Sequence, residues 1–220
     1  MFKKLEEKMK RMVSDHVSFD PSSIDDPVAM QTEWTPAKGG GANFRTHKLV
    51  TVSTNCMEFR ASIGAKLFYL IFLLAGMGIL IGGSFSKFSS EALSFDMETF
   101  IFLFLGLVFV SVGGSMLYFG TAPIVFDKRK GFFWKGRKAP DQVLNKSSLK
   151  HFAHLEQIHA LQLVSEYCRG NKSSYYSYEL NLVLGNGQRI NVVDHGNQNK
   201  LRGDATSLSS FLEKPIWDVI

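Results

Sequence analysis

The sequence predicts an α+β membrane protein in which a two-helix transmembrane hairpin precedes a β-rich domain that ends in a helix. Three observations support this prediction. Two long runs, 67–85 and 99–119, contain no charged residue, and six basic residues follow the second run closely. Beyond them, short alternating apolar segments separated by turn residues are typical of strands. The last periodic segment places its apolar residues at helical spacing.

The two uncharged runs are long and apolar enough to cross a membrane as helices. Residues 99–119 are 21 in number, and thirteen of them are Leu, Ile, Val or Phe. At roughly −0.3 to −0.6 kcal/mol for each of these, insertion is favoured by about 4 to 8 kcal/mol. Residues 67–85 form the other run, and each run can cross ~30 Å of hydrocarbon. We therefore predict transmembrane helices at 65–85 and 99–120, joined by a short external loop at 86–98.

The charges flanking the two runs predict the orientation of the chain. The loop at 86–98 carries one Lys and three acidic residues, whereas basic residues lie before the first run and after the second. Because basic residues near a membrane stay on its cytoplasmic side, we expect both termini in the cytoplasm and the protein in the cell (inner) membrane. The basic residues before the first run are Lys48, Arg60 and Lys66.

Residues 1–45 predict a cytosolic amphipathic helix followed by a loop. In residues 1–13 the apolar side chains share one helical stripe, with Lys and Glu on the other side. This helix either lies on the inner leaflet or packs on the protein's own domain. The prolines and the Gly39–Gly41 triplet predict mostly loop up to residue 41, and no GK[ST] follows that triplet as a phosphate-binding loop requires. Alternation around Ser53-Thr54-Asn55 then predicts a cytosolic β-hairpin at 46–64.

Residues 121–220 predict a cytosolic domain of several strands and one closing helix. Strands are expected at 123–127 and 131–136, and two more at 158–168 and 175–184. A Gly-Asn-Gly turn leads into another strand, and Asn-Gly is a strong hairpin signal. Strands followed by one covering helix are the plan of pleckstrin-homology-like domains. The apolar face of the expected helix, about 199–212, consists of Leu201, Ala205, Leu208, Phe211 and Leu212.

Residues 65–220 carry a family resemblance. Two adjacent spans precede the sequence FDKRKG at Phe126–Gly131, and a strand and turn follow near Gly187. This pattern resembles the photosystem I assembly factors of chloroplasts and cyanobacteria and two-span bacterial membrane proteins with a pleckstrin-homology-like cytosolic domain. The long N-terminal segment departs from the photosynthetic proteins. The resemblance implies a non-catalytic membrane scaffold, and its closing residues are Ala205, Leu208, Phe211, Leu212, Pro215 and Ile216.

The sequence contains little that predicts catalysis. Zinc needs three or four converging ligands, and the cluster His151, His154 and His159 lacks a suitably spaced partner except Glu156. Asp194-His195 has no nucleophile in a GxSxG-like context. Cys56 and Cys168, the only cysteines, belong to no CxxC and are expected as thiols in a reducing compartment. We predict no enzyme, no catalytic residue, no cofactor and no metal.

The basic hairpin after the second run is the better candidate site. Each juxtamembrane Lys or Arg gains about 1 kcal/mol near an anionic leaflet. We expect lipid-headgroup contact from these residues, with Phe132, Phe133 and Trp134 at interfacial depth. The alternative is that the charges only set topology. Nucleic acid is not expected as a partner, because the charge lies beside the membrane. The six basic residues are Lys128, Arg129, Lys130, Lys135, Arg137 and Lys138.

Small residues in the two runs predict close helix packing. Gly78-x-x-x-Gly82 on one run and Gly113-Gly114 on the other favour close approach of backbones, either between the two helices of one chain or in a homo-oligomer. Neither uncharged run holds an ionisable residue of the kind that marks ion paths, which disfavours a channel.

Together these patterns predict a non-catalytic integral membrane scaffold or assembly factor. Its cytosolic domain is expected to bind a protein partner at the inner membrane face. The alternatives are an anionic-lipid-sensing membrane protein and a homo-oligomeric membrane pore. Membrane lipids are expected partners in each case.

Overall fold

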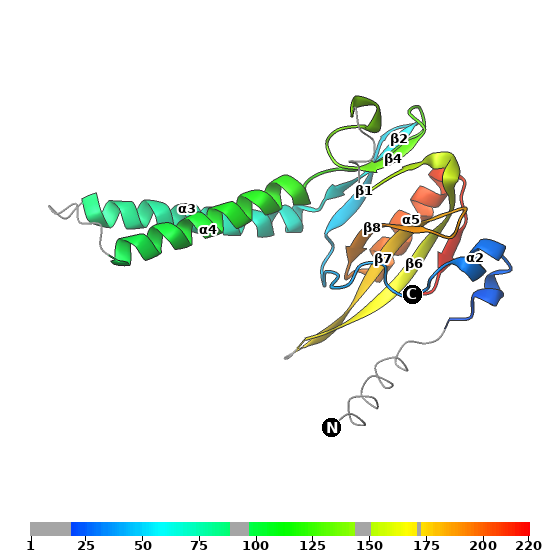
Figure 1. Ribbon diagram of the computed structural model, residues 1–220, viewed down its shortest axis with the longest axis horizontal. Helices are drawn as coiled ribbons and strands as arrows, with labels where there is room; N and C mark the ends of the chain where they lie inside the picture. The colour runs from blue at the N-terminus through cyan, green and yellow to red at the C-terminus, as the bar shows by residue number, and fades with distance from the viewer. Residues whose placement is uncertain (1–18, 89–96, 144–150, 171–172) are drawn as a thin grey trace, which may run out of the picture.

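A computed structural model describes residues 19–88, 97–143, 151–170 and 173–220. The fold is α+β: two long helices extend side by side from a body that contains two β-sheets (Figure 1). The amphipathic helix predicted at 1–13 and residues 89–96 of the predicted external loop lie outside the described residues.

The two long helices, α3 (Ile63–Phe88) and α4 (Met97–Gly120), are each long and apolar enough to span a membrane. Few residues of either apolar segment are buried within the protein. Large side chains such as Ile71 and Phe104 are instead about 60% exposed, at 63% and 60%. A core helix of a soluble protein would bury such side chains. The two helices are therefore weak but direct support for a membrane protein.

The contact between α3 and α4 is made at three glycines. A Cβ atom added to Gly76 would lie 2.6 Å from the backbone nitrogen of Val110, and one added to Gly106 would lie 2.7 Å from Leu80. Gly113 meets the backbone of Leu73 in the same way. At Gly76 and Gly113 the two backbones approach closely, and at Gly106 the missing side chain leaves room for the side chain of Leu80.

Of the four glycines predicted to pack helices, one lies in the contact between α3 and α4. Gly113 lies in the helix contact, but a Cβ added to Gly78, Gly82 or Gly114 would have no neighbour within 4 Å. These three glycines lie on outward-facing parts of the hairpin surface. For these three glycines the interpretation as contacts within one chain is wrong, because a GxxxG spacing identifies a helix stripe without specifying which neighbour that stripe faces. Their alternative use, in contacts between copies of the chain, stays a prediction.

Sheet A joins strands from both sides of the helical hairpin. It is antiparallel throughout, in the order β1-β2-β3-β4-β5. Strand β2 pairs with β3, so the segments before α3 and after α4 share one sheet. The strands are β1 (His47–Ser53), β2 (Cys56–Ala61), β3 (Ile124–Asp127), β4 (Phe132–Lys135) and β5 (Phe152–His154).

Sheet B is formed entirely by the C-terminal part of the chain. Its order is β8-β7-β6-β9, and β9 runs parallel to β6 while the other pairs are antiparallel. Gly187, with φ of 78°, makes the turn between β7 and β8, where a residue with a side chain would be strained. The strands are β6 (Ile158–Arg169), β7 (Ser174–Leu184), β8 (Arg189–His195) and β9 (Ile216–Asp218).

Helix α5 (Gln198–Leu212) contributes to the main hydrophobic core. Its N-terminus is capped by Asn197, whose side chain accepts a hydrogen bond from the Lys200 amide. One apolar face then packs with residues of both sheets. The core includes Phe59 and Phe126 from sheet A, Leu163 and Leu180 from sheet B, and the α5 residues Leu201, Ala205, Leu208 and Leu212.

Residues 19–46, here called the strap, cross the other face of sheet B. They contain the short helices η1 (Pro21–Ile24) and α2 (Pro27–Gln31), which lie beside this sheet in Figure 1. Trp34 packs against Trp217 of β9, with ring centroids 5.6 Å apart. The buried carboxylate of Glu179 on β7 accepts hydrogen bonds from the amides of Ala37 and Lys38 at 2.8 and 2.9 Å. The strap is thus an ordered layer that covers polar as well as apolar groups of the sheet.

Two short 3-10 helices complete the described elements. They are η2 (Pro140–Gln142), after β4, and η4 (Leu155–Gln157), between β5 and β6.

Candidate functional site

The six basic residues predicted as one lipid contact are divided by the β3–β4 hairpin. Strand β3 leads away from the end of α4 and β4 returns, with Ile124 opposite Lys135 and Asp127 opposite Phe132. At ~3.3 Å per residue, the two ends of the hairpin are about 10 Å apart. The turn therefore carries one group of three basic residues far from α4, and the end of β4 carries the other group near it.

The far group is partly neutralised within the domain. The ammonium of Lys128 lies 3.2 Å from the carboxylate of Glu213 and over the ring of Phe211. The ammonium of Lys130 lies 2.7 Å from the carboxylate of Asp141. Arg129 is exposed, and its amide donates to Asp127. This group does not form a single headgroup-facing patch with the residues beyond β4.

The predicted interfacial aromatic residues are largely inside the domain. Phe133 is fully buried against Phe126, with ring centroids 4.9 Å apart. Trp134 is 6% exposed and packs with Val125. Placing these two side chains at a membrane interface was wrong, because both faces of β4 are covered. Phe132 alone of the three is half-buried.

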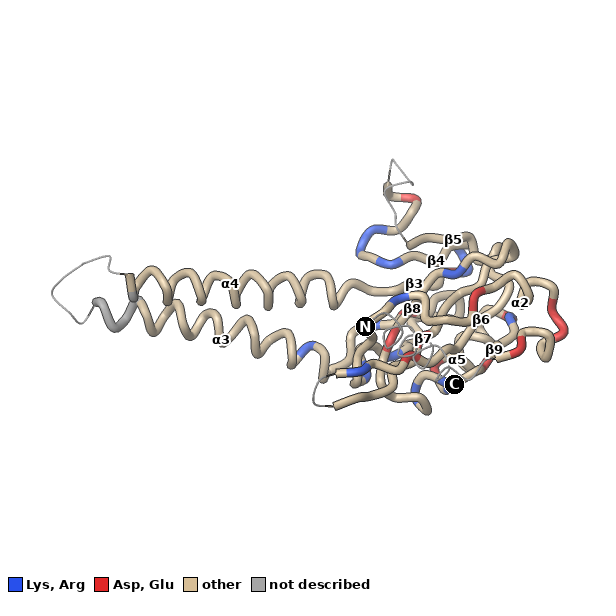
Figure 2. The backbone as a smooth tube through the Cα atoms, turned by 60° about the horizontal axis from the view of Figure 1, so that its bottom comes forward, with Lys and Arg blue, Asp and Glu red and all other residues tan. Residues whose placement is uncertain are grey.

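Two residues of the near group, Arg137 and Lys138, belong to a ring of exposed basic residues around the base of the helical hairpin, whereas the third, Lys135, is half-buried. Arg137 donates hydrogen bonds to the Tyr118 carbonyl at 3.1 Å and to Thr121 Oγ1 at 2.9 Å, at the last turn of α4. Figure 2 shows that the basic positions lie on the sheets and near the base of the hairpin, while the described outer parts of both helices are free of them. We call this ring the basic collar; its members are Lys48, Arg60, Lys66, Arg137 and Lys138.

A polar cleft of about 360 Å³ lies at the same level, between the sheets and the base of the hairpin. Four separate parts of the chain supply its polar side: the strap, the start of β1, the end of β4 and β8. The ends of α3 and α4 supply its aromatic side through Tyr69 and Phe119. Its polar lining residues include Lys38, Thr46, His47, Lys135, Asn191 and Asp194.

Lys135 is the central cation of the cleft. Among the described residues, its ammonium has one hydrogen bond, to Asn191 Oδ1 at 3.4 Å, which is long for a charged donor. Burial lowers the pKa of Lys135 from 10.5 to about 8, and nearby Asp194 opposes this by favouring the charged form. At neutral pH the side chain is mostly charged, although it is poorly solvated and weakly paired.

The other groups of the cleft combine one acid, one further cation and a neutral imidazole. The Asp194 carboxylate accepts a hydrogen bond from Asn191 Nδ2 at 2.5 Å and lies 3.9 Å from the Lys38 ammonium. Burial raises the pKa of Asp194. Burial also lowers the pKa of His47 to about 4, so this ring is neutral at pH 7 and lies within hydrogen-bond reach of Thr46 Oγ1. The arrangement suits a ligand with both an anionic group and a hydrogen-bond donor.

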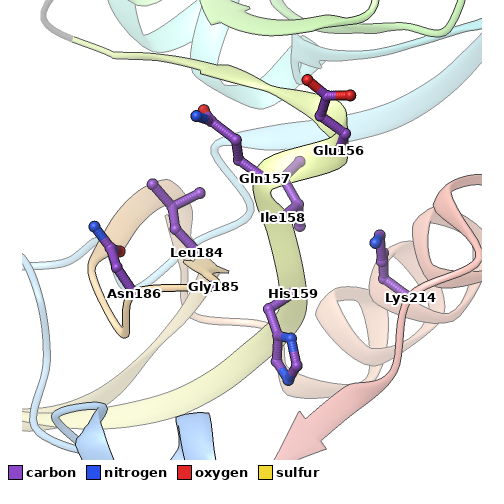
Figure 3. A pocket seen from close by; sticks show the side chains of 8 residues that line it. All are labelled: Glu156, Gln157, Ile158, His159, Leu184, Gly185, Asn186 and Lys214. Carbon is purple, nitrogen blue, oxygen red and sulfur yellow. The ribbon is translucent and has the colours of Figure 1, made fainter.

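A second cavity, of about 320 Å³, lies between the start of β6, the β7–β8 turn and the end of α5. Figure 3 shows that its charged side chains do not converge: Glu156 points away from the cavity centre and from Lys214. His159 Nε2 lies 2.7 Å from the Asp26 carboxylate of the strap, which ties the ring to a structural contact. This cavity is therefore the weaker candidate.

Residues with catalytic or metal-binding potential are dispersed. In the ranges that the structure describes, no three His, Cys, Asp or Glu side chains are placed to share a metal ion. His154 packs on Phe132, whereas His159 lies under the strap. His195 is fully buried, and its Nδ1 accepts a hydrogen bond from the Asn197 amide.

Sequence reasoning identified Lys135 as a site residue but missed the groups around it. Lys38, His47 and Asn191 come from segments that are distant in sequence, and Asp194 was considered only as a catalytic acid. The available signal was a polar residue at Asn191 within the otherwise apolar strand 190–193. Comparisons of the chain with protein-family models, with curated proteins and with solved structures find no match.

Proposed function

We propose that this chain is a non-catalytic integral membrane protein that holds a folded domain rigidly against the cytosolic face of the cell membrane. In this proposal α3 and α4 span the bilayer, both termini are cytoplasmic, and the two sheets with α5 serve as a pleckstrin-homology-like module. The domain then acts as a scaffold at the lipid surface, where a protein partner can dock.

The observation that carries the proposal is the direct connection of both helices to neighbouring strands. Ser62 alone separates β2 from α3, and its side chain accepts a hydrogen bond from the Ala65 amide in the first turn. Residues 121–123 separate α4 from β3, and β3 pairs with β2. Two short connections into adjacent strands prevent the domain from swinging on a flexible linker. Its orientation to the helices is therefore fixed.

The basic collar supports lipid contact by this oriented domain. All five of its side chains are exposed at the end of the helical hairpin that joins the sheets. Juxtamembrane cations near an anionic leaflet contribute about 1 kcal/mol each. Arg60 is paired with the Glu58 carboxylate at 2.8 Å, so the other four residues favour the cytosolic orientation most and hold the adjoining sheet edges near the headgroups. This lipid role has more support from the geometry than the pore alternative, which needs a second copy to meet the outward-facing glycines.

The β6–β7 hairpin supports the same orientation. In Figure 1 this hairpin projects from sheet B toward the side of the molecule on which α3 and α4 extend, and the pairs near Arg169 and Ser174 form its outer described end. There Tyr167 and Tyr176 are opposite each other in register, 47% and 54% exposed, with ring centroids 5.1 Å apart. Tyr is enriched at membrane–water interfaces. We assign this pair as a second contact with the headgroup region.

Thiol labelling in intact cells tests the topology. Cys56 and Cys168 are replaced by Ser, and a single cysteine is placed either at Ser94, between the helices, or at Ser207, exposed on α5. A membrane-impermeant maleimide should label Ser94→Cys in intact cells and Ser207→Cys only after permeabilisation. Labelling of Ser207→Cys in intact cells, with none at Ser94→Cys, would reject the proposal.

Co-purification tests the scaffold role without dismantling the fold. Deleting 121–220 would remove β3, the sheet partner of β2, so the variant must leave both sheets intact. Tyr167→Ser with Tyr176→Ser changes only exposed side chains of the β6–β7 hairpin that are assigned to lipid, so it serves as the control and should recover the same partners as the unmodified chain. After cross-linking in cells, the unmodified chain should co-purify with a membrane complex that docks on its cytosolic domain. If no specific partner co-purified with the unmodified chain, the scaffold role would be refuted. The lipid contact of the anchored domain would then be the remaining function.

A further inference from the structure

The ammonium of Lys135 has few hydrogen-bond partners among the described residues, so the cleft at the base of the helical hairpin can accept an anion. An ammonium has three donors, and this one has a single long hydrogen bond to Asn191 within the described residues. A poorly solvated cation with so few partners destabilises a fold unless something else completes its coordination. The cleft that it lines is large enough, at about 360 Å³, to admit a small anionic group.

The remaining polar groups define what else that ligand must carry. Lys38 stands at the mouth with its side chain 70% exposed and adds a second positive charge. Asp194, 11% exposed, would repel a bare phosphate but would accept a hydrogen bond from an amine or hydroxyl. A ligand that pairs with the lysine ammonium groups and also with the Asp194 carboxylate must therefore carry both a phosphate and a hydrogen-bond donor.

The position of the cleft identifies the source of such a ligand. Tyr69 and Phe119 line its other side at the ends of α3 and α4, where the apolar helix surfaces begin. The ring of Tyr69 lies so close to Gly120 that a Cβ there would come within 2.7 Å of it, so this wall is closely packed. A headgroup in the cleft would thus have its acyl chains directed along apolar helix surfaces.

We propose that the cleft binds the headgroup of a phospholipid whose phosphodiester carries a hydrogen-bond donor, such as ethanolamine or glycerol. The phosphate contacts the ammonium groups of Lys135 and Lys38, and the donor contacts the carboxylate of Asp194. Choline lipids fit poorly because a trimethylammonium group has no hydrogen to donate. The inference rests on the proposed membrane placement of the helices.

The charges around Lys135 give the binding a pH dependence. Asp194 on β8 and Glu179 on β7 favour its charged form, while burial and Lys38 of the strap oppose it. His47 on β1 is neutral at pH 7. Because only the charged amine attracts phosphate, affinity should fall as the pH rises through and beyond about 8. Bound phosphate favours the charged form, so the fall is displaced upward at saturating lipid.

The test measures binding of short-chain lipids to the full chain in detergent by calorimetry. The probes are dihexanoyl phosphatidylethanolamine, phosphatidylglycerol and phosphatidylcholine, together with inorganic phosphate. The first two should bind at least about ten-fold more tightly than the third, and inorganic phosphate should bind weakly. Equal binding of all three lipids would overturn the role of Asp194. Tight binding of inorganic phosphate without lipid binding would overturn the lipid source.

Two lysines of the same β-hairpin provide a matched pair of variants. Lys135→Gln should weaken phosphatidylethanolamine binding by about ten-fold or more, and Lys128→Gln, at the far turn, should leave it unchanged. Lys135→Met removes the poorly paired charge and should raise the urea midpoint while it abolishes binding. Retained lipid affinity in either Lys135 variant overturns the proposal. Because this assay does not depend on cellular orientation, its failure is distinguishable from failure of the thiol-labelling test.

Discussion

The helical hairpin and the β domain are packed in opposite ways. In the domain, large side chains such as Phe59, Phe126 and Phe133 fill the interior. In the hairpin, most large side chains face outward, and the helices approach backbone to backbone at Gly76 and Gly113, beside the stacked rings of Phe72 and Phe109. Water drives apolar side chains inward, whereas lipid does not, so helices in lipid gain most from close backbone approach. This contrast is what the proposed placement of the helices in a membrane requires.

The largest expected effect compares the same residue type in the two regions. Phe126→Ala removes a fully buried ring from the core and should destabilise the domain by about 3–5 kcal/mol. Phe104→Ala, on the exposed surface of α4, should change stability by less than about 0.5 kcal/mol. Urea unfolding of the full chain in detergent, followed by tryptophan fluorescence, measures both. If both variants lost the same free energy of unfolding, the two regions would not differ in how they pack their large side chains.

Acid should destabilise the domain through two histidines. Burial lowers the pKa of His47 and of His195 to about 4, whereas both titrate near 6.5 in the unfolded chain. The unfolded chain therefore binds more protons between these values. Stability should fall as the pH falls from 6.5 to 4, by up to about 1.4 kcal/mol per pH unit for each histidine.

Urea midpoints measured across that pH range check this expectation. A His47→Asn, His195→Asn double variant should have a flatter profile and serves as the control. Buried carboxyls such as Asp194, whose pKa is raised, act in the opposite direction, so the comparison with the double variant isolates the histidines. Equal pH profiles in the two proteins would show that neither ring is held neutral by the fold.

Two adjacent glycines sharpen the comparison within the hairpin. Gly113→Leu places a side chain against the backbone of Leu73 and should cost about 1–3 kcal/mol of helix packing. Gly114→Leu enters open space and should have little effect. Phe72→Cys and Phe109→Cys, whose native rings are 6.0 Å apart, report the spacing through a short bifunctional thiol reagent. If Gly114→Leu abolished the cross-link and Gly113→Leu did not, then Gly114, and not Gly113, would lie in the contact between α3 and α4.

The smallest effect is expected where the two regions meet. Arg137 binds the Tyr118 carbonyl and lies over the Tyr118 ring, 5.1 Å from its centroid. Arg137→Gln should lose about 0.5–1 kcal/mol locally, because a cation at a helix C-terminus and over an aromatic ring contributes that much. Faster hydrogen exchange confined to the last turn of α4 would show it. Lys138→Gln is the control, and similar exchange in both variants would contradict a specific role for Arg137.

The sequence predicted best those elements that depend on local pattern. The uncharged runs coincide with α3 and α4, and the apolar spacing at 199–212 coincides with α5. Pairing of β2 with β3 and the path of the strap could not be predicted in this way, because they join segments distant in sequence. Phe133 and Trp134 were misplaced for a related reason. Local alternation does not reveal that both faces of a strand are covered.

The candidate site follows the same division. Charge and position identified Lys135, but its importance comes from weak pairing inside a cleft that four distant segments build. Lys128 and Lys130, equally basic in sequence, are paired with acidic residues. The sequence does not distinguish Lys128 and Lys130, which pair with carboxylates, from Lys135, which has one long hydrogen bond among the described residues.

The split of sheet A around the helical hairpin has a consequence for biosynthesis. During translation β2 emerges first, and Phe59 must wait for Ile124, its register partner, until both helices have been made. At ribosomal speed that interval is roughly 3 to 13 s. Throughout it a strand edge stays open to wrong pairing. For a chain inserted as proposed, sheet A is therefore completed only after the second helix has been made, and the β domain matures later than the helical hairpin.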